Sequence, residues 1–267
     1  MAHFATKDGG RVYYEHHAAS GPTVVLIHGW GMSGDYWAPT VATLVANGYG
    51  TITIDHRGCG RSDRDFADLS IEAVARDVFD IVEHVGVTRV VLNGWSLGAA
   101  VAVFAAHALG SKVAGLVSTC GATPRYTQAD GFPHGGTAED VLGIGAAVRA
   151  DRAEFFRALG KGAVGEGASE ALSDWLERGF LDSGARATET LNGLATLDQR
   201  DILASFDFPF LSIGGAKDTV ADPAIAGFAA QCAKHGTLVT MPTGHSPHLE
   251  DPAGYHEALL GFLRRAA

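Results

Sequence analysis

Short apolar runs rich in β-branched residues alternate along this chain with stretches of helical periodicity. Residues 23–27 read Thr-Val-Val-Leu-Ile, a continuous apolar run that is typical of a strand buried on both faces of a sheet. Similar runs follow at residues 51–54, 89–92, 115–118, 210–213 and 237–240. This alternation predicts an α/β fold in which helices cover a mostly parallel sheet. Residues 11–15 are expected to pair with the opening residues as an antiparallel edge.

Capping residues indicate where several helices begin and end. Ser70 can cap a helix whose apolar stripe runs through residues 71–85, and Gly86 suits its end. Two later helices are expected to open at the Asp-Pro pairs 222–223 and 251–252. Aspartate there accepts bonds from free backbone N–H groups, and proline at the first helical position has no N–H to leave unpaired.

The alternation breaks between residues 124 and 199, where no convincing strand occurs. Helical patterns lie around residues 152–156 and 171–176. We interpret residues 124–199 as a helical cap over one end of the sheet, which divides the core into residues 1–123 and 200–267. The alternative is that this stretch supplies further core helices.

Composition and charge argue against several classes of protein. The 267 residues are 46% apolar and 19% charged, which is enough to build a large core and too apolar for a disordered chain. The formal net charge is −10 and no basic run occurs, so we expect no nucleic-acid partner.

The expected location is the cytoplasm. The N-terminal residues lack the layout of a secretion signal, and the longest apolar stretch, residues 97–106, is too short to span a membrane. We therefore expect no membrane association. Cys59, Cys120 and Cys232 lie far apart and are expected to be reduced thiols, with no disulfide and no zinc site.

The sequence Gly94-Trp95-Ser96-Leu97-Gly98 lies between a predicted strand and a predicted helix. The pattern Gly-x-Ser-x-Gly in this position is typical of a nucleophile elbow. A serine on so sharp a turn holds a strained backbone, and side chains at the flanking positions would collide with neighbouring elements. The helix start behind Ser96 also offers N–H groups and a positive dipole end to an oxyanion.

A serine nucleophile needs a base, and His245 is the best candidate among the 12 histidines. It follows the last predicted strand, at the carboxyl end of the sheet where α/β sheets bind ligands, and it comes after the serine in sequence. His248 is the competing candidate. It lies nearer the helix that opens at residue 251 and is expected to have a structural role.

Asp218 is the candidate for the acid that orients the histidine. It falls between Ser96 and His245 in sequence and follows the carboxyl end of a predicted strand. Asp222 is expected to cap a helix, and we reason that an acid accepting backbone N–H groups is poorly free to hold an imidazole. Asp207 precedes its strand and would lie at the wrong end. A solvated loop role for Asp218 remains the alternative.

Two further loops that follow predicted strands contain residues with expected roles. His28-Gly29-Trp30-Gly31 follows the first buried strand, and the backbone N–H groups of Trp30 and Leu97 are the expected oxyanion donors. His28 itself is expected to brace this loop. In the loop 55–62, Arg57 or Arg61 is expected to brace the turn and Cys59 to be structural.

Five motifs in this order resemble the α/β-hydrolase superfamily: residues 28–31, 55–62, 94–98, 215–218 and 244–252. The pairing of the first and third motifs is similar to the pimeloyl-carrier-protein methyl ester carboxylesterases, and the second is similar to the cofactor-free haloperoxidase and arylesterase branch. The resemblance implies eight strands, a helical cap after the sixth strand, and a relay of Ser96, Asp218 and His245. Haloalkane dehalogenases and epoxide hydrolases of the superfamily carry aspartate where this chain has Ser96.

These residues predict a serine hydrolase that cleaves carboxylic esters of small to medium acyl or aryl groups through an acyl-enzyme. Trp30, Met32 and Trp95 are expected to line the substrate pocket, and the cap offers Phe132, Phe155, Phe156 and Trp175. No metal or organic cofactor is expected. The same residues could serve a lactonase, a C–C bond hydrolase or a perhydrolase. A rival of another class is a ligand-binding receptor that keeps the fold and turns over slowly.

Overall fold

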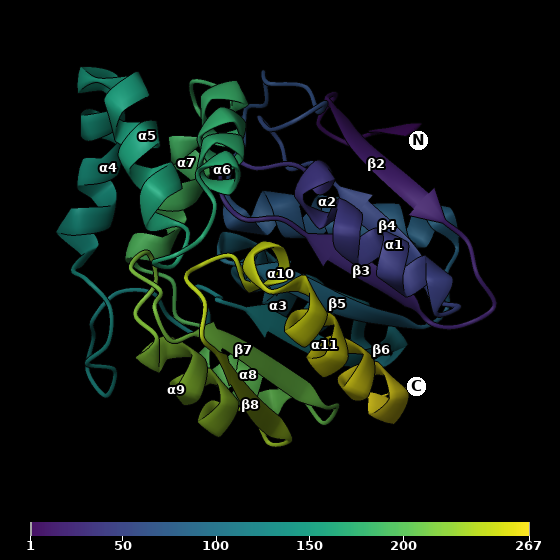
Figure 1. Cartoon of the computed structure of the whole chain (residues 1–267). Coiled ribbons are helices and arrows are strands. Elements are labelled where there is room, and N and C mark those ends of the chain that lie inside the picture. The colour runs from purple at the N-terminus through teal and green to yellow at the C-terminus, as the bar shows by residue number, and fades with distance from the viewer. Residues whose placement is uncertain (1, 267) are drawn as a thin grey trace.

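The computed structural model describes residues 2–266, and its framework is one eight-stranded sheet in the order β1-β2-β4-β3-β5-β6-β7-β8 (Figure 1). The strands are β1 (Ala2–Ala5), β2 (Arg11–His17), β3 (Thr23–Ile27), β4 (Gly50–Ile54), β5 (Val90–Trp95), β6 (Val113–Thr119), β7 (Phe210–Gly215) and β8 (Gly236–Met241). Strands β3 to β8 run parallel to one another. The α/β-hydrolase fold expected from the sequence is confirmed.

The antiparallel edge is also confirmed. Strand β1 pairs with β2, and β2 pairs in turn with β4, both antiparallel. Strand β3 lies at the centre, where Val25 pairs with Ile52 on one side and with Leu92 on the other. All five residues of β3 are buried, as its unbroken apolar run predicted.

Helices of the core cover both faces of this sheet. They are α1 (Ala38–Ala46), α2 (Ile71–Val85), α3 (Leu97–Leu109), α8 (Arg200–Ser205), α9 (Ala224–Cys232), α10 (Pro247–Glu250) and α11 (Pro252–Ala266). In the strand order, β4 lies on one side of β3 and β5 lies on the other side. The connection from β3 to β4 therefore crosses the sheet in one direction, and the connection from β4 to β5 crosses it in the opposite direction. Because parallel crossovers are right-handed, α1 and α2 lie on opposite faces. Helix α11 packs on α1, and α3 packs on α2.

The caps of these helices agree with the sequence. The Ser70 hydroxyl accepts the Ala73 N–H at 3.1 Å, and α2 ends at Gly86 in a left-handed conformation. Asp222 and Asp251 each accept a backbone N–H two or three residues later. Helix α9 begins one residue after the proline that we expected to open it.

Four helices stand between β6 and α8 and lie above the carboxyl end of the sheet, at the upper left of Figure 1. They are α4 (Ala138–Ala150), α5 (Arg152–Gly162), α6 (Glu170–Asp182) and α7 (Thr188–Asn192). They pack chiefly on one another, α5 against α6 and α4 against α5 and α7. The helical insertion after the sixth strand is therefore present, and the exact division at residues 124 and 199 stays a prediction. Between residues 2 and 266 we find no helix with the length and apolar character needed to cross a bilayer.

The loop after β4 is held by a buried ion pair. The Arg57 guanidinium donates to the Asp77 carboxylate on α2 at 2.7 Å and to the Asp68 carbonyl at 3.0 Å. Both side chains of the pair are almost fully buried. Arg61 in the same loop donates through its own backbone N–H and its side chain to the buried Asp55. Both arginines brace this loop, as expected.

Replacing Arg57 with alanine is expected to lower the free energy of unfolding by about 3–5 kcal/mol, because the Asp77 carboxylate would be left buried without its partner. The matched control is Arg76→Ala, which breaks an exposed pair with Asp68 and should cost less than about 1 kcal/mol. Denaturant unfolding of the two variants measures both values. Equal losses would contradict the bracing role of Arg57.

Candidate active site

Ser96 occupies a sharp turn between β5 and α3. Its backbone has φ 56° and ψ −124°, and Ser96 and Cys120 are the non-glycine residues with positive φ in the described part of the chain. A Cβ on Gly98 would lie 2.3 Å from the Ile27 carbonyl oxygen, and one on Gly94 would lie 2.3 Å from the Gly98 carbonyl oxygen. The prediction that side chains at these two flanks would collide with neighbouring backbone is therefore confirmed.

The two expected oxyanion donors lie close to this turn. Leu97 is the first residue of α3, and its N–H has no hydrogen-bond acceptor within residues 2–266. The Trp30 N–H likewise has none there. The loop of Trp30 lies against the elbow, since a Cβ on Gly29 would stand 3.2 Å from the Ser96 Cβ. Free N–H groups beside a serine are the arrangement that an oxyanion requires.

Asp218 and His245 are brought together by hydrogen bonding. The His245 Nδ1 lies 2.7 Å from the Asp218 Oδ2, and both side chains are buried. The His245 carbonyl accepts the Trp95 indole N–H at 2.7 Å, which ties the histidine loop to the elbow. The imidazole is therefore fixed from both its ring and its backbone.

The other Asp218 oxygen accepts the backbone N–H groups of Val220 and Ala221 at 2.8 and 2.9 Å. An aspartate can therefore accept backbone N–H groups and still hold an imidazole, so the criterion that we applied to Asp222 is wrong. Asp222 is nevertheless occupied elsewhere, since it accepts the N–H groups of Ala224 and Gly135. Asp207 pairs with Lys234 on the surface.

Ser96 and His245 line the same cavity, of about 400 Å³. Within residues 2–266 no hydrogen bond joins the Ser96 hydroxyl to the imidazole, and Asp218 lies outside the cavity behind His245. Catalytic hydrogen bonds are often long before substrate binds. The serine and the histidine thus both face one shared space.

The cavity contains the three pocket residues expected from the sequence, Trp30, Met32 and Trp95. Of the four aromatic residues of the cap, Phe155 lines it. Phe156 packs against the Trp30 ring behind the wall, Phe132 packs against Phe228, and Trp175 stacks on Tyr36 at the surface.

Sequence reasoning missed most of the remaining lining, which is apolar. It includes Tyr126, Ile144, Leu159, Phe180, Leu191, Leu194 and Val220. Most of these residues belong to the stretch between β6 and β7, where their helical spacing could only indicate packing.

His28 braces the loop that carries Trp30, as expected. Its Nδ1 contacts the Gly29 carbonyl at 2.7 Å, and its Nε2 accepts the His56 N–H at 2.9 Å. The two imidazole rings stack with centroids 3.7 Å apart. Burial lowers the pKa of both histidines, so both rings are neutral near pH 7. This neutral pair fixes the loop next to the elbow.

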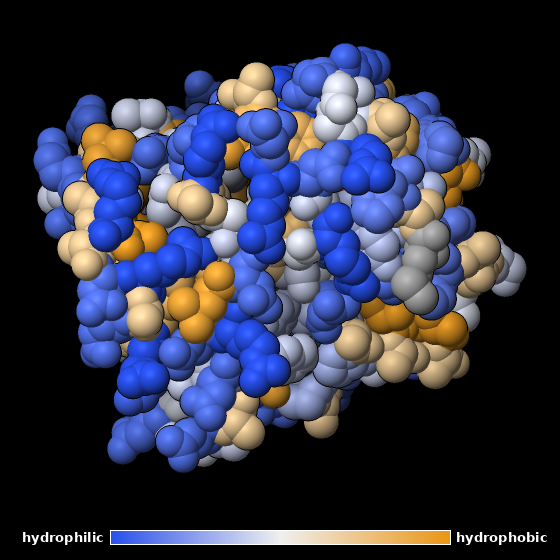
Figure 2. Space-filling model, turned by 90° about the horizontal axis from the view of Figure 1, so that it is seen from above, coloured by the Kyte–Doolittle hydropathy of each residue, from blue (hydrophilic) through white to orange (hydrophobic). Residues whose placement is uncertain are grey.

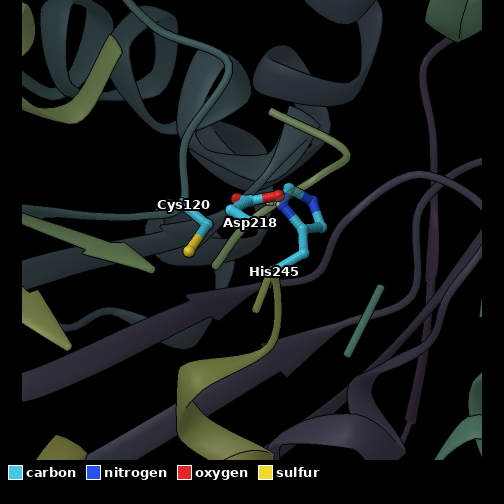
Figure 3. Close-up of side chains that lie close together, drawn as sticks. All are labelled: Cys120, Asp218 and His245. Atoms are coloured by element: carbon cyan, nitrogen blue, oxygen red, sulfur yellow. Dashed lines mark hydrogen bonds and ion pairs between the residues drawn. The ribbon is translucent and has the colours of Figure 1, made fainter. Parts of the chain in front are cut away.

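Cys120 is a neighbour of the site that sequence reasoning did not place. It follows β6, and its Sγ, one Asp218 oxygen and one His245 nitrogen all lie within 4.8 Å of one another (Figure 3). Burial, followed by the charge of Asp218, raises the pKa of the Cys120 thiol well above its ordinary value. These three atoms could serve as metal ligands, but the Cys120 thiol donates to the Gly244 carbonyl at 3.7 Å and the His245 Nδ1 already contacts Asp218. The donor set therefore fits a hydrogen-bonded relay better than a metal centre.

His248, the rival base, is fully buried between Trp37 and Trp95. Neither of its ring nitrogens has a hydrogen-bond partner within residues 2–266. Burial lowers the pKa of His248 to about 3. It does not line the cavity that contains Ser96, which favours His245 as the base.

This buried histidine predicts a pH dependence of stability. Its folded pKa of about 3 is below the unfolded value of 6.5, so between these values the unfolded state binds the extra proton. The free energy of unfolding therefore falls as the pH falls through this window, by about 1.4 kcal/mol per pH unit from this residue. In His248→Phe that contribution disappears, so denaturant titrations should give a shallower slope. The control His107→Gln alters an exposed histidine and should keep the wild-type slope.

Comparison with known proteins places the chain in a family. The sequence model of the protein family described as alpha/beta hydrolase fold matches residues 22–252. A pimeloyl-[acyl-carrier protein] methyl ester esterase of Stenotrophomonas maltophilia is 32% identical, with 91% of this chain and 93% of that protein covered. A non-heme chloroperoxidase of Streptomyces lividans is 29% identical over 93% of this chain and 98% of its own length.

A similar solved structure is an esterase from Exiguobacterium antarcticum, with a TM-score of 0.93 and 26% identity over 98% of both chains. The two branches that the sequence resembled are thus both among its relatives. The order of strands, the elbow at Ser96 and these matches lead to one conclusion: the chain belongs to the family of the alpha/beta hydrolase fold.

Proposed function

We propose that this protein is a serine hydrolase that cleaves carboxylic esters through an acyl-enzyme. The observation that carries the proposal is the 2.7 Å contact between Asp218 and His245, behind a cavity that His245 shares with Ser96. A carboxylate bonded to Nδ1 keeps the proton on that nitrogen and leaves Nε2 as the base. Relatives named as esterases support the same chemistry.

The proposed reaction has two halves. The Ser96 Oγ attacks the ester carbonyl carbon while the His245 Nε2 takes the hydroxyl proton, and the N–H groups of Trp30 and Leu97 bind the oxyanion. The imidazolium then gives its proton to the leaving alkoxide, which departs as the alcohol. Water attacks the acyl-enzyme in the same way, and its proton returns through His245 to the Ser96 oxygen as the acid leaves. Asp218 stabilises the imidazolium in both halves.

Acyl transfer to hydrogen peroxide is a second candidate, because one relative is named a bifunctional esterase/perhydrolase and is 25% identical over 99% of this chain. Peroxide would replace water in the second half and leave as a peracid. A lactone or a C–C bond could enter the first half in place of an ester. The slow-turnover receptor is the candidate outside catalysis.

Ser96→Ala is expected to lower kcat for p-nitrophenyl acetate by at least about 10⁴-fold, because the other hydroxyls that line the cavity, those of Tyr126 and Thr219, are bonded to backbone carbonyls. The control Ser111→Ala changes an exposed serine after α3 and should keep wild-type rates. A fluorophosphonate should label the wild type and the control at Ser96 and leave Ser96→Ala unlabelled. A wild type that takes the label but turns over no ester, lactone or peroxide would instead indicate the receptor.

Asp218→Asn tests the orienting role of the acid. The amide oxygen can keep the bonds from Val220 and Ala221, but the amide nitrogen would offer a proton to Nδ1 and favour the wrong tautomer. We expect a loss of about 10³–10⁴-fold in kcat with little change in stability. Asp222→Asn provides the matched comparison, since Asp222 caps a helix outside the cavity. Similar kcat losses in the two variants would refute the role of Asp218.

A further inference from the structure

We propose that the cavity above Ser96 is an uncharged chamber for one medium-length hydrocarbon chain of the substrate, and that Met32 forms its end wall. This inference rests on the proposed function and adds the class of ester that it would take. It depends on three properties of the cavity: its polar groups, its shape and what lies behind Met32.

No lining residue is charged except His245 when it is protonated, and the polar side chains other than those of Ser96 and His245 are engaged with protein carbonyl groups. The bonds run from Trp30 Nε1 to Ala187 (2.8 Å), Trp95 Nε1 to His245 (2.7 Å), the Tyr126 hydroxyl to Val220 (2.6 Å) and the Thr219 hydroxyl to Gly162 (3.0 Å). A charged group in the chamber would thus lose its water and find no partner beyond the reacting centre.

The chamber has a deep end and a mouth. Its buried lining includes Trp30, Met32, Phe180, Leu191 and Leu194. The more exposed lining includes Ile144, Phe155, Ala158 and Thr219, from α4, α5 and the loop after β7. An apolar chain that enters past α5 would therefore bury its far end among the first group. Seen from the side of the cap, the outer surface is mostly hydrophilic with scattered apolar residues, in contrast to this lining (Figure 2).

Met32 separates this chamber from a second space. It also lines a groove of about 370 Å³ whose other walls carry Arg61, Arg64, Arg178, Asp35 and Asp182. The Met32 side chain packs tightly against α6, since a Cβ on Gly179 would lie 2.9 Å from its Sδ. One unbranched side chain therefore stands between an apolar chamber and a charged groove. Its truncation would extend the chamber toward that groove.

The first test is a chain-length and charge series. One arm varies the acyl part, from p-nitrophenyl acetate to the dodecanoate, and the other varies the alcohol part of alkyl acetates over the same lengths. In the arm whose chain enters the chamber, kcat/KM should rise about fourfold per methylene, reach a maximum and then fall. In that arm an ester with a carboxylate at the chain end should react at least about 100-fold more slowly than its neutral match. The pair is p-nitrophenyl hydrogen adipate against the hexanoate for the acyl arm, and 5-carboxypentyl acetate against hexyl acetate for the alcohol arm.

The second test uses the variant Met32→Ala in the preferred arm. The measured quantity is the ratio of kcat/KM for a ten-carbon chain to kcat/KM for a four-carbon chain. Any general loss of activity cancels in this ratio. The ratio should rise at least about tenfold. Met241→Ala is the matched control, because Met241 is a buried methionine that lines neither space. The control should keep the wild-type ratio.

Flat profiles in both arms, a carboxylate tolerated as well as the neutral chain, or equal ratios in the two methionine variants would overturn the inference while ester hydrolysis stands. Equilibrium binding separates the two proposals in the other direction. Ser96→Ala keeps the chamber, and the fluorescence of Trp30 and Trp95 can report binding of intact ethyl hexanoate and ethyl hydrogen adipate, which have the same chain length. Preference for the hexanoate without any wild-type turnover would support the chamber and refute the hydrolase. No preference would refute the chamber whatever the turnover.

Discussion

The turn at Ser96 is possible only because two neighbouring positions have no side chain. Gly98 lies against the backbone of β3 and Gly94 lies against the start of α3, so helix and strand approach more closely than any larger residue allows. A positive-φ serine in such a turn is strained by about 1–3 kcal/mol, and the surrounding packing must hold it there. The buried central strands supply that packing. The strained backbone conformation of Ser96 therefore depends on the packing of the central strands.

The same sheet explains why residues far apart in sequence meet. The loops after β3, β5, β7 and β8 leave the carboxyl edge of a parallel sheet side by side, and they carry Trp30, Ser96, Asp218 and His245 respectively. Further contacts then fix each loop: the His28–His56 pair holds the first, the Trp95 indole ties the fourth to the second, and Asp218 ties the third to the fourth through His245. The site is therefore held by side-chain contacts on the side of the core.

Sequence reasoning predicted the sheet and the loops at its carboxyl edge well, and it predicted the contribution of the helices after β6 poorly. Strand runs and position at strand ends are local signals, and they located most of the strands and the candidates Asp218 and His245. The count of eight strands and the relay of these residues were implied by the family resemblance, and the structure shows the sheet and the contact between Asp218 and His245. Applying the rule of strand ends to β6 would also have found Cys120, which follows it directly. Trp30, Met32 and Trp95 of the pocket were expected, but the lining that comes from the helices after β6 could not be predicted in this way. Whether Phe155 or Phe156 faces the cavity depends on how α5 is rotated over the core, and long-range packing decides that rotation.

Ser96 and His245 reach the cavity from loops at the carboxyl edge of the sheet, whereas most of its apolar lining comes from the segment between β6 and β7. Substitutions in those helices can reshape the space around a substrate while the reacting atoms keep their positions, because the two sets of residues belong to different layers. The substrate preference of such a protein can therefore change while the residues at the carboxyl edge of the sheet stay the same. This separation offers a physical reason why relatives with one architecture carry names as different as methyl ester esterase and chloroperoxidase.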